Sequence, residues 1–126
     1  MLKKEILRNK DDFSIIYRKG KSIGGRYIVL FYRKNNLPYN RTAFLASKKV
    51  GNSVVRHHLC RLVRESYRLN EDKFDRGLDL VVIVRPGARE LPFSDIDRAL
   101  LHVSRKLGVL QKTEGAEKKN TIGESR

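Results

Sequence analysis

The segment that most constrains the fold runs over residues 47–68, SKKVGNSVVRHHLCRLVRESYR, where a basic loop leads into an amphipathic helix capped by Asn52 or Ser53. At about 100° per residue, one arc of this helix is mainly apolar and predicts a buried face; it holds Val55, Leu59, Leu62, Val63, Ser66 and Leu69. A second arc is basic, with Arg56 and Cys60 on its flank; it holds Ser53, His57, Arg61, Arg64 and Arg68. Because the planar guanidinium donates two parallel hydrogen bonds to phosphate, this face predicts an RNA partner.

Charge and composition agree with that interpretation. The 126 residues fit a single domain with a formal net charge of +14, a field that attracts polyanions. A lone cysteine, Cys60, fits a reducing compartment, and no apolar run approaches the roughly 18 residues that span a bilayer. The basic helix offers mainly Val and Leu opposite its charges, which suit a protein core better than a membrane surface. We therefore expect a cytoplasmic protein with no membrane partner.

The first half of the chain predicts one helix and two strands. Residues 11–18 have helical apolar spacing, with Asp11 or Asp12 as the cap and Gly20 as the end. Residues 26–33 and 42–47 are rich in β-branched and aromatic residues, which is typical of strands. The short loop between these strands predicts that they pair with each other in antiparallel fashion.

The second half predicts a buried strand, a helix and a tail. Residues 78–84, LDLVVIV, form the continuous apolar run of a strand covered on both faces. Ser94 and Asp97 predict a capping box for a helix whose buried positions are Ile96, Leu100, Val103 and Leu107. Residues 1–110 then form a single α+β domain, an α-β-β-α-β-α sandwich. Residues 111–126 are polar and predicted to be disordered.

Four motifs give this chain a resemblance to the protein subunit of bacterial ribonuclease P, over roughly residues 5–110. They are Asp12-Phe13-x-x-x-Tyr17-x-x-Gly20, the loop Ser47–Asn52, the arginine helix, and Val81–Pro86. The resemblance implies a fold like that of the ribosomal S5 domain 2, with a left-handed β-α-β crossover, although right-handed crossovers are the general rule. It also implies that an RNA subunit hydrolyses the 5′ leader of precursor tRNA with Mg²⁺. The protein then binds ribonuclease P RNA and the leader, and holds no cofactor tightly.

The resemblance assigns site residues of two kinds. It places Phe13, Tyr17 and Phe31 in a leader-binding cleft, where rings stack on bases of any sequence. The candidates for phosphate contact, to leader or RNA subunit, are the cations Lys48, Lys49, Arg56, His57, Arg61, Arg64 and Arg68. The resemblance also implies that this helix departs from the family motif, because two basic positions are His58 and Cys60 here and the asparagine position is His57. Contacts made by the replaced side chains are therefore left open.

Two other classes of function compete with this interpretation. A ribosomal or assembly-type RNA-binding protein would share the charge and the α+β build, but the loop at 47–52 and the arginine helix favour ribonuclease P. A self-sufficient nuclease would need catalytic carboxylates or a nucleophile with its base. The acidic pairs at 11–12, 71–72 and 95/97 instead suit helix ends, and neighbouring histidines at 57 and 58 point about 100° apart, unlike zinc ligands. We expect neither a catalytic residue nor a metal ligand in the protein.

Overall fold

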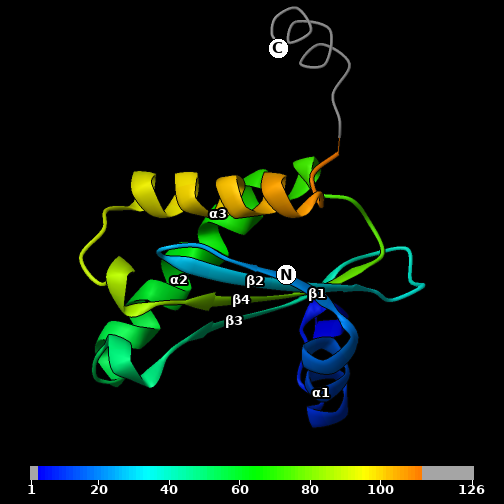
Figure 1. Ribbon diagram of the computed structural model, residues 1–126, viewed down its shortest axis with the longest axis horizontal. Helices are drawn as coiled ribbons and strands as arrows, with labels where there is room; N and C mark the ends of the chain where they lie inside the picture. Colours follow the sequence, from blue (N-terminus) through cyan, green and yellow to red (C-terminus); the bar gives the residue numbers. More distant parts are fainter. Residues whose placement is uncertain (1–2, 112–126) are drawn as a thin grey trace, which may run out of the picture.

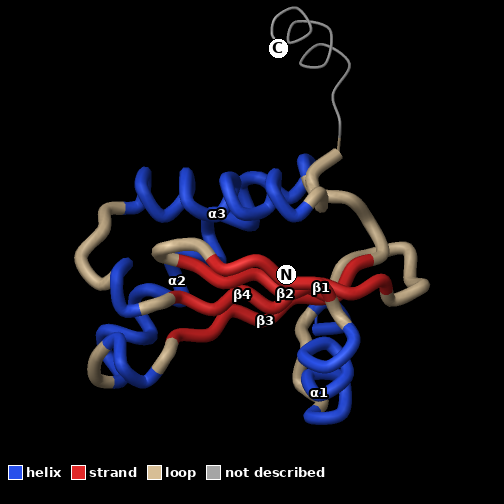
Figure 2. The backbone as a smooth tube through the Cα atoms, viewed as in Figure 1, coloured by secondary structure: helices blue, strands red, loops and turns tan. Residues whose placement is uncertain are grey.

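A computed structural model describes residues 3–111 and shows a sheet between two unequal helical layers (Figures 1 and 2). The described strands lie in the order β1-β2-β4-β3; their bounds are Lys21–Gly24 (β1), Ile28–Lys34 (β2), Arg41–Ala46 (β3) and Leu78–Val84 (β4). The α-helices are Lys10–Lys19 (α1), Ser53–Asn70 (α2) and Phe93–Leu107 (α3). Short 3-10 helices precede or follow them at Lys3–Glu5 (η1), Lys48–Val50 (η2), Glu71–Lys73 (η3) and Pro86–Ala88 (η4). The mixed α+β class is confirmed.

β4 is the central strand, as its apolar sequence predicted. It pairs antiparallel with β2 and parallel with β3, so β3-α2-β4 is the parallel β-α-β unit that the resemblance implied. The predicted pairing of residues 26–33 with 42–47 is wrong, because β4 lies between β2 and β3. The loop between them instead crosses the start of β4, where Asn35 N–H donates to the Gly77 carbonyl and Leu78 N–H donates to Asn40 Oδ1 (2.8 Å each).

The sheet also contains a strand that the sequence reasoning missed. β1 pairs antiparallel with β2, from Lys21 opposite Tyr32 to Gly24 opposite Val29. Its four residues carry a single large apolar side chain, Ile23, and end at Gly24, which Gly25 follows, so its sequence lacks the pattern of a strand. β1 forms because β2 offers it a free edge.

The two faces of the sheet bury very different cores. Alternate residues of β4, from Leu78 to Val84, contact the main core, which α2 and α3 complete. The opposite face carries a small cluster in which Leu7, Ile16, Ala43 and Val81 are buried. α1 stands on one end of that second face and leaves the other end uncovered (Figure 1). This uncovered end is the setting of the candidate site.

The helix ends follow the predictions in part. Asn52 caps α2 by accepting from the Val55 N–H (3.0 Å). α1 is capped by Asn9 rather than Asp11 or Asp12, since Asn9 Oδ1 accepts from the Asp11 N–H (2.8 Å). Gly20 is its C-cap, as predicted.

The predicted capping box of the last helix is wrong. α3 begins at Phe93 after Pro92, without a side-chain cap. The Asp97 side chain instead contacts α2, where its carboxylate accepts hydrogen bonds from Ser66 Oγ (2.6 Å) and Asn70 Nδ2 (2.8 Å). The predicted apolar stripe of α3 does pack in the core, with Leu107 at its partly buried end.

The predicted core face of α2 is confirmed except at its end. Leu59, Val63 and Ser66 are buried, and Val55 and Leu62 pack against the core. Leu69 was wrongly assigned to this face, because its side chain is 58% exposed at the edge of the stripe. Tyr67, which is 1% exposed, occupies the place instead.

The predicted tail begins at residue 111, the last residue that the structure describes. Gln111 is held by η3, donating from its backbone N–H to the Lys73 carbonyl (2.6 Å) and from Nε2 to the Phe74 carbonyl (3.0 Å). Residues 112–126 lie outside the described residues.

Candidate nucleic-acid interface

Strand register arranges the α1 face of the sheet in three rows. The first row is charged and joins Arg33, Asp79 and Arg41; the second joins Phe31, Val81 and Ala43; the third joins Val29, Ile83 and Leu45. The second row supports α1 through the small cluster described above. The third row is apolar and lies beyond it, with Leu45 39% exposed. An apolar strip open to solvent is therefore available beside α1.

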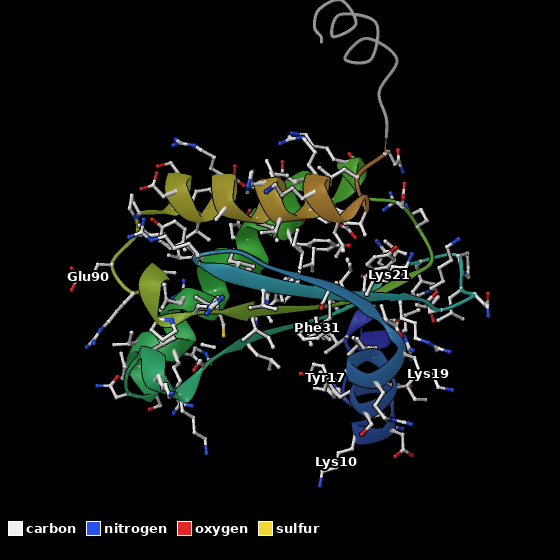
Figure 3. The ribbon with its side chains drawn as sticks, in the orientation of Figure 1. Lys10, Tyr17, Lys19, Lys21, Phe31 and Glu90 are labelled. Atoms are coloured by element: carbon white, nitrogen blue, oxygen red, sulfur yellow. The ribbon has the colours of Figure 1, made fainter. Side chains whose placement is uncertain are left out.

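Three aromatic rings stand where α1 meets this strip. Tyr17 and Phe31 pack edge to face with their centroids 5.0 Å apart, and Phe13 lies 6.2 Å from Tyr17. Tyr17 is 43% exposed, while Phe13 and Phe31 are half-buried. Figure 3 shows Tyr17 on the side of α1 that faces the uncovered half of the sheet, with Lys19 on the other side. The structure thus brings together the three aromatic residues that the sequence reasoning selected.

Burial also changes the chemistry of Tyr17. Its partial burial raises the pKa of the phenol above the ordinary value. A phenol is protonated at neutral pH even at its ordinary pKa, so the hydroxyl places no negative charge beside an incoming phosphate. The ring offers an uncharged face suited to stacking on a base.

Two lysines lie at the end of the uncovered strip. The chain leaves β3 at Ser47, whose N–H donates to the carbonyl of Val84 at the end of β4 (3.1 Å). Ser47 Oγ then accepts from the Lys49 N–H (3.3 Å), and buried Val50 anchors the turn. Lys48 and Lys49 remain exposed at this end of the sheet. The apolar strip therefore leads to two cations at the end of the same face of the sheet.

The basic side of α2 forms a separate surface. α2 packs with α3 on the opposite face of the sheet from the aromatic rings. His57, Arg61, Arg64 and Arg68 are exposed there, as predicted, and the Arg64 guanidinium lies 5.9 Å from the Phe44 ring. The predicted site residues are thus divided between two surfaces, with Lys48 and Lys49 at the strand end between them.

Arg68 differs from its neighbours because it already has an anionic partner. Its Nε and Nη2 donate to both oxygens of Glu65 (3.0 and 2.6 Å). This bond lowers the pKa of Glu65 and raises that of Arg68. Of the predicted phosphate contacts, Arg68 is therefore the one that has an ion-pair partner within residues 3–111.

Arg56 and Cys60 occupy the flank of α2, as the helical spacing predicted. Arg56 is half-buried, and its Nε is buried without a hydrogen-bond partner within residues 3–111. Burial raises the pKa of the Cys60 thiol, although Arg64 and Arg56 oppose that effect. Cys60 therefore behaves as a neutral packing residue in a position where the family pattern carries a positive charge.

The sequence reasoning overlooked Arg41 and Asp79. Arg41 donates to both oxygens of Asp79 (2.8 and 2.7 Å) and from Nη1 to Asp12 on α1 (3.4 Å). Asp79 is only 4% exposed. A signal was present in the sequence, because Asp79 is the one acidic residue in the apolar run at 78–84 and a buried carboxylate needs a partner.

Within residues 3–111, no His, Cys, Asp or Glu side chains gather in a group of three that could hold a metal. Among these same residues, no helix combines the length and the apolarity that crossing a bilayer requires.

Comparison with known proteins decides between the alternatives. The family model for ribonuclease P matches residues 1–108. The ribonuclease P protein component of Alkaliphilus metalliredigens is 45% identical over 104 residues, which cover 82% of this chain and 94% of the relative. That of Lachnoclostridium phytofermentans is 43% identical over 110 residues, which cover 87% and 95%. The chain belongs to the ribonuclease P protein family.

Solved ribonuclease P proteins share this fold. The Staphylococcus aureus protein aligns with a TM-score of 0.78 at 29% identity, over 85% of this chain and 98% of that one. The Thermotoga maritima protein aligns with a TM-score of 0.74 at 34% identity, over 80% and 96%. The predicted family and fold class are confirmed, and a ribosomal protein is excluded. As a ribonuclease P protein component, the chain is a subunit of an endoribonuclease that processes tRNA.

Proposed function

We propose that this ribonuclease P protein binds the 5′ leader of precursor tRNA along the uncovered half of its sheet. The observation that carries the proposal is the group of aromatic rings beside an open apolar strip that ends at two exposed lysines. Rings stack on bases of any sequence, and lysines neutralise phosphates, so the surface suits a single strand of variable sequence. It offers little hydrogen-bond readout of base edges, as a variable leader requires.

The basic side of α2 is proposed as the surface for ribonuclease P RNA. Arg61 and Arg64 are exposed and free of ion pairs within residues 3–111. Half-buried Arg56 adds a further positive charge at the flank of this surface. Arg68 ranks below them, because a phosphate would have to displace Glu65. His57 adds a hydrogen-bond donor to this surface. Two surfaces for two RNAs explain why the predicted site residues do not converge on one point.

In this proposal the RNA subunit performs the hydrolysis with Mg²⁺, and the protein contributes binding. The chemistry of the leader surface fits that division, because its aromatic rings and lysines bind RNA but provide no general base at neutral pH. A cytoplasmic location completes the proposal and rests on the reducing compartment that a single cysteine suits.

The test is cleavage of precursor tRNA at low Mg²⁺ with bacterial ribonuclease P RNA, with and without this protein, and with the protein alone. We expect cleavage at the 5′ end that requires the RNA and rises with the protein. Arg64→Ala should weaken assembly with the RNA by about 10-fold, as for loss of one charge-assisted contact. Arg105→Ala, which removes an exposed arginine from the last turn of α3, is the control and should leave assembly unchanged.

Two results would contradict the proposal. Normal RNA binding without stimulation of cleavage would leave only general RNA affinity. Cleavage by the protein alone would show that the chain contains an active site.

A further inference from the structure

α1, which carries two of the three aromatic rings, has a small apolar base. Ile16 is the buried residue of this helix, and Phe13 is only partly buried. The main core lies on the other side of the sheet and includes no residue of α1. Hydrophobic packing therefore holds α1 against the sheet without strongly fixing its angle.

A polar contact joins the first turn of α1 to the sheet. Arg41 Nη1 donates to Asp12 Oδ2 (3.4 Å), while its Nε and Nη2 bind both oxygens of Asp79 (2.8 and 2.7 Å). Asn35 Nδ2 donates to the same Asp79 oxygen, Oδ1 (2.9 Å). The hydrogen bonds to Asp79 raise the pKa of Arg41, and their bidentate geometry holds the guanidinium in one orientation.

This contact lies directly beside the aromatic rings. Arg41 and Asp79 form the charged row of the sheet, and Phe31 lies in the next row. On the helix, Asp12 immediately precedes Phe13 and lies five residues before Tyr17. A change in the angle of α1 at Asp12 would therefore move both helical rings relative to Phe31.

We propose that Arg41 is a positioning residue for leader binding, which orients α1 through Asp12 so that Phe13 and Tyr17 face Phe31 across the open strip. This inference rests on the proposed role of that strip in leader binding. Asp79 is already satisfied by the two bonds from Arg41 and the bond from Asn35. The third contact, to Asp12, is not needed to satisfy Asp79, and it is the one that reaches the helix bearing the rings.

The experiment compares two substitutions in the first turn of α1. Asp12→Ala removes the acceptor of Arg41 and leaves the Arg41–Asp79 pair in place. Asp11→Ala is the matched control, because Asp11 lies in the same turn and carries the same charge but is exposed and makes no side-chain contact with Arg41. Each variant is assembled with bacterial ribonuclease P RNA, and the dissociation constants for precursor tRNA with its leader and for mature tRNA are measured.

The informative quantity is the dissociation constant for mature tRNA divided by that for precursor tRNA. This ratio reports leader binding alone, and we call it the leader-dependent gain. We expect Asp12→Ala to reduce the leader-dependent gain by about 3- to 10-fold, because misplaced rings would lose part of the affinity that stacking on one base provides. Affinity for mature tRNA should stay the same, and Asp11→Ala should keep the full gain. Amide hydrogen exchange should also quicken in α1 of Asp12→Ala but not in α2 or α3.

Arg41→Lys provides a second arm at unchanged charge. An ammonium does not reproduce the fork that binds two carboxylates at once, so the leader-dependent gain should fall as in Asp12→Ala. Thermal unfolding of each variant separates this effect from loss of the fold. If Asp12→Ala lowers the unfolding temperature but keeps the full leader-dependent gain, the contact is merely structural and the inference is overturned.

Failure of the proposed function would look different. If the wild-type assembly itself bound precursor and mature tRNA equally, leader binding by this surface would be wrong, and the role of Arg41 would be overturned with it. A wild-type gain that disappears in Tyr17→Ala but persists in Asp12→Ala would retain the leader site and overturn only the positioning role.

Discussion

Tyr17 is the most exposed of the three rings at the candidate leader site, and it can be removed with little loss of core packing. Its side chain is 43% exposed, whereas neighbouring Ile16 is fully buried in the small cluster under α1. Phe31 supports the tyrosine ring through an edge-to-face contact with the centroids 5.0 Å apart, and the exposed part of the ring remains open to solvent. A ring held in this way suits stacking on a flexible single strand.

Substitution of Tyr17 should therefore affect leader binding more than stability. Tyr17→Ala should weaken binding of precursor tRNA to the assembled enzyme by about 5- to 100-fold, the range for stacking on one base, with mature tRNA unaffected. Tyr17→Phe should retain most of the leader affinity, because the ring face remains. Competition binding with labelled precursor tRNA measures both. Equal loss in the two variants would assign the contact to the hydroxyl instead.

At the scale of elements, individual helices and strands could be predicted better than their pairing. The arginine helix was placed correctly because its caps and apolar spacing are local properties of the chain. The loop between β2 and β3 gave the wrong neighbour for β3, because a short loop favours a hairpin until the more apolar β4 takes the central position; the family resemblance had implied the parallel unit of β3 with β4. Likewise, Tyr67 rather than Leu69 completes the core face of α2 because α3 and β3 decide which edge of the stripe is covered.

The junction between α1 and β1 depends on a close approach of backbones at Gly20. A Cβ on this residue would lie 2.5 Å from the Ile16 carbonyl oxygen and 2.6 Å from that of Tyr32. Gly20→Ala should therefore lower the free energy of unfolding by about 1–3 kcal/mol, as for overpacked sites. Gly24→Ala is the control, since its nearest neighbours would be 3.7 Å away. Urea unfolding of both variants measures the difference, and equal stability would show that the junction can relax.

At the scale of the whole molecule, nearly all of the net charge of +14 lies in residues 1–111, because residues 112–126 hold four Lys/Arg and three Asp/Glu and contribute only +1. Both proposed RNA surfaces contribute to this charge. Positive charge of this size attracts RNA at long range and makes its binding sensitive to salt. The charge alone does not say where the RNA lies, because cations also cover α3. The position of the RNA has to be inferred from the local arrangement of the aromatic rings, the apolar strip and the basic side of α2.

Salt dependence separates the surfaces. The double variant Lys48→Ala/Lys49→Ala should reduce the slope of log affinity against log salt by about 1 to 2 for precursor tRNA, as for two lost phosphate contacts. The double variant Arg105→Ala/Lys106→Ala removes two exposed cations from the far end of α3 and should leave the slope unchanged. Filter binding over a series of salt concentrations gives both slopes. Similar losses would indicate that net charge, rather than position, governs binding.

The sequence by itself determined the family, the α+β class, the basic side of α2 and the three rings, because motifs, helical spacing and residue chemistry are local. Only the tertiary structure decided that β4 separates β2 from β3, that the rings and the arginines of α2 lie on opposite faces of the sheet, and that Arg41 joins Asp79 to Asp12. These features join residues far apart in the chain. Their formation depends on which surfaces compete for burial, and no single segment contains that information.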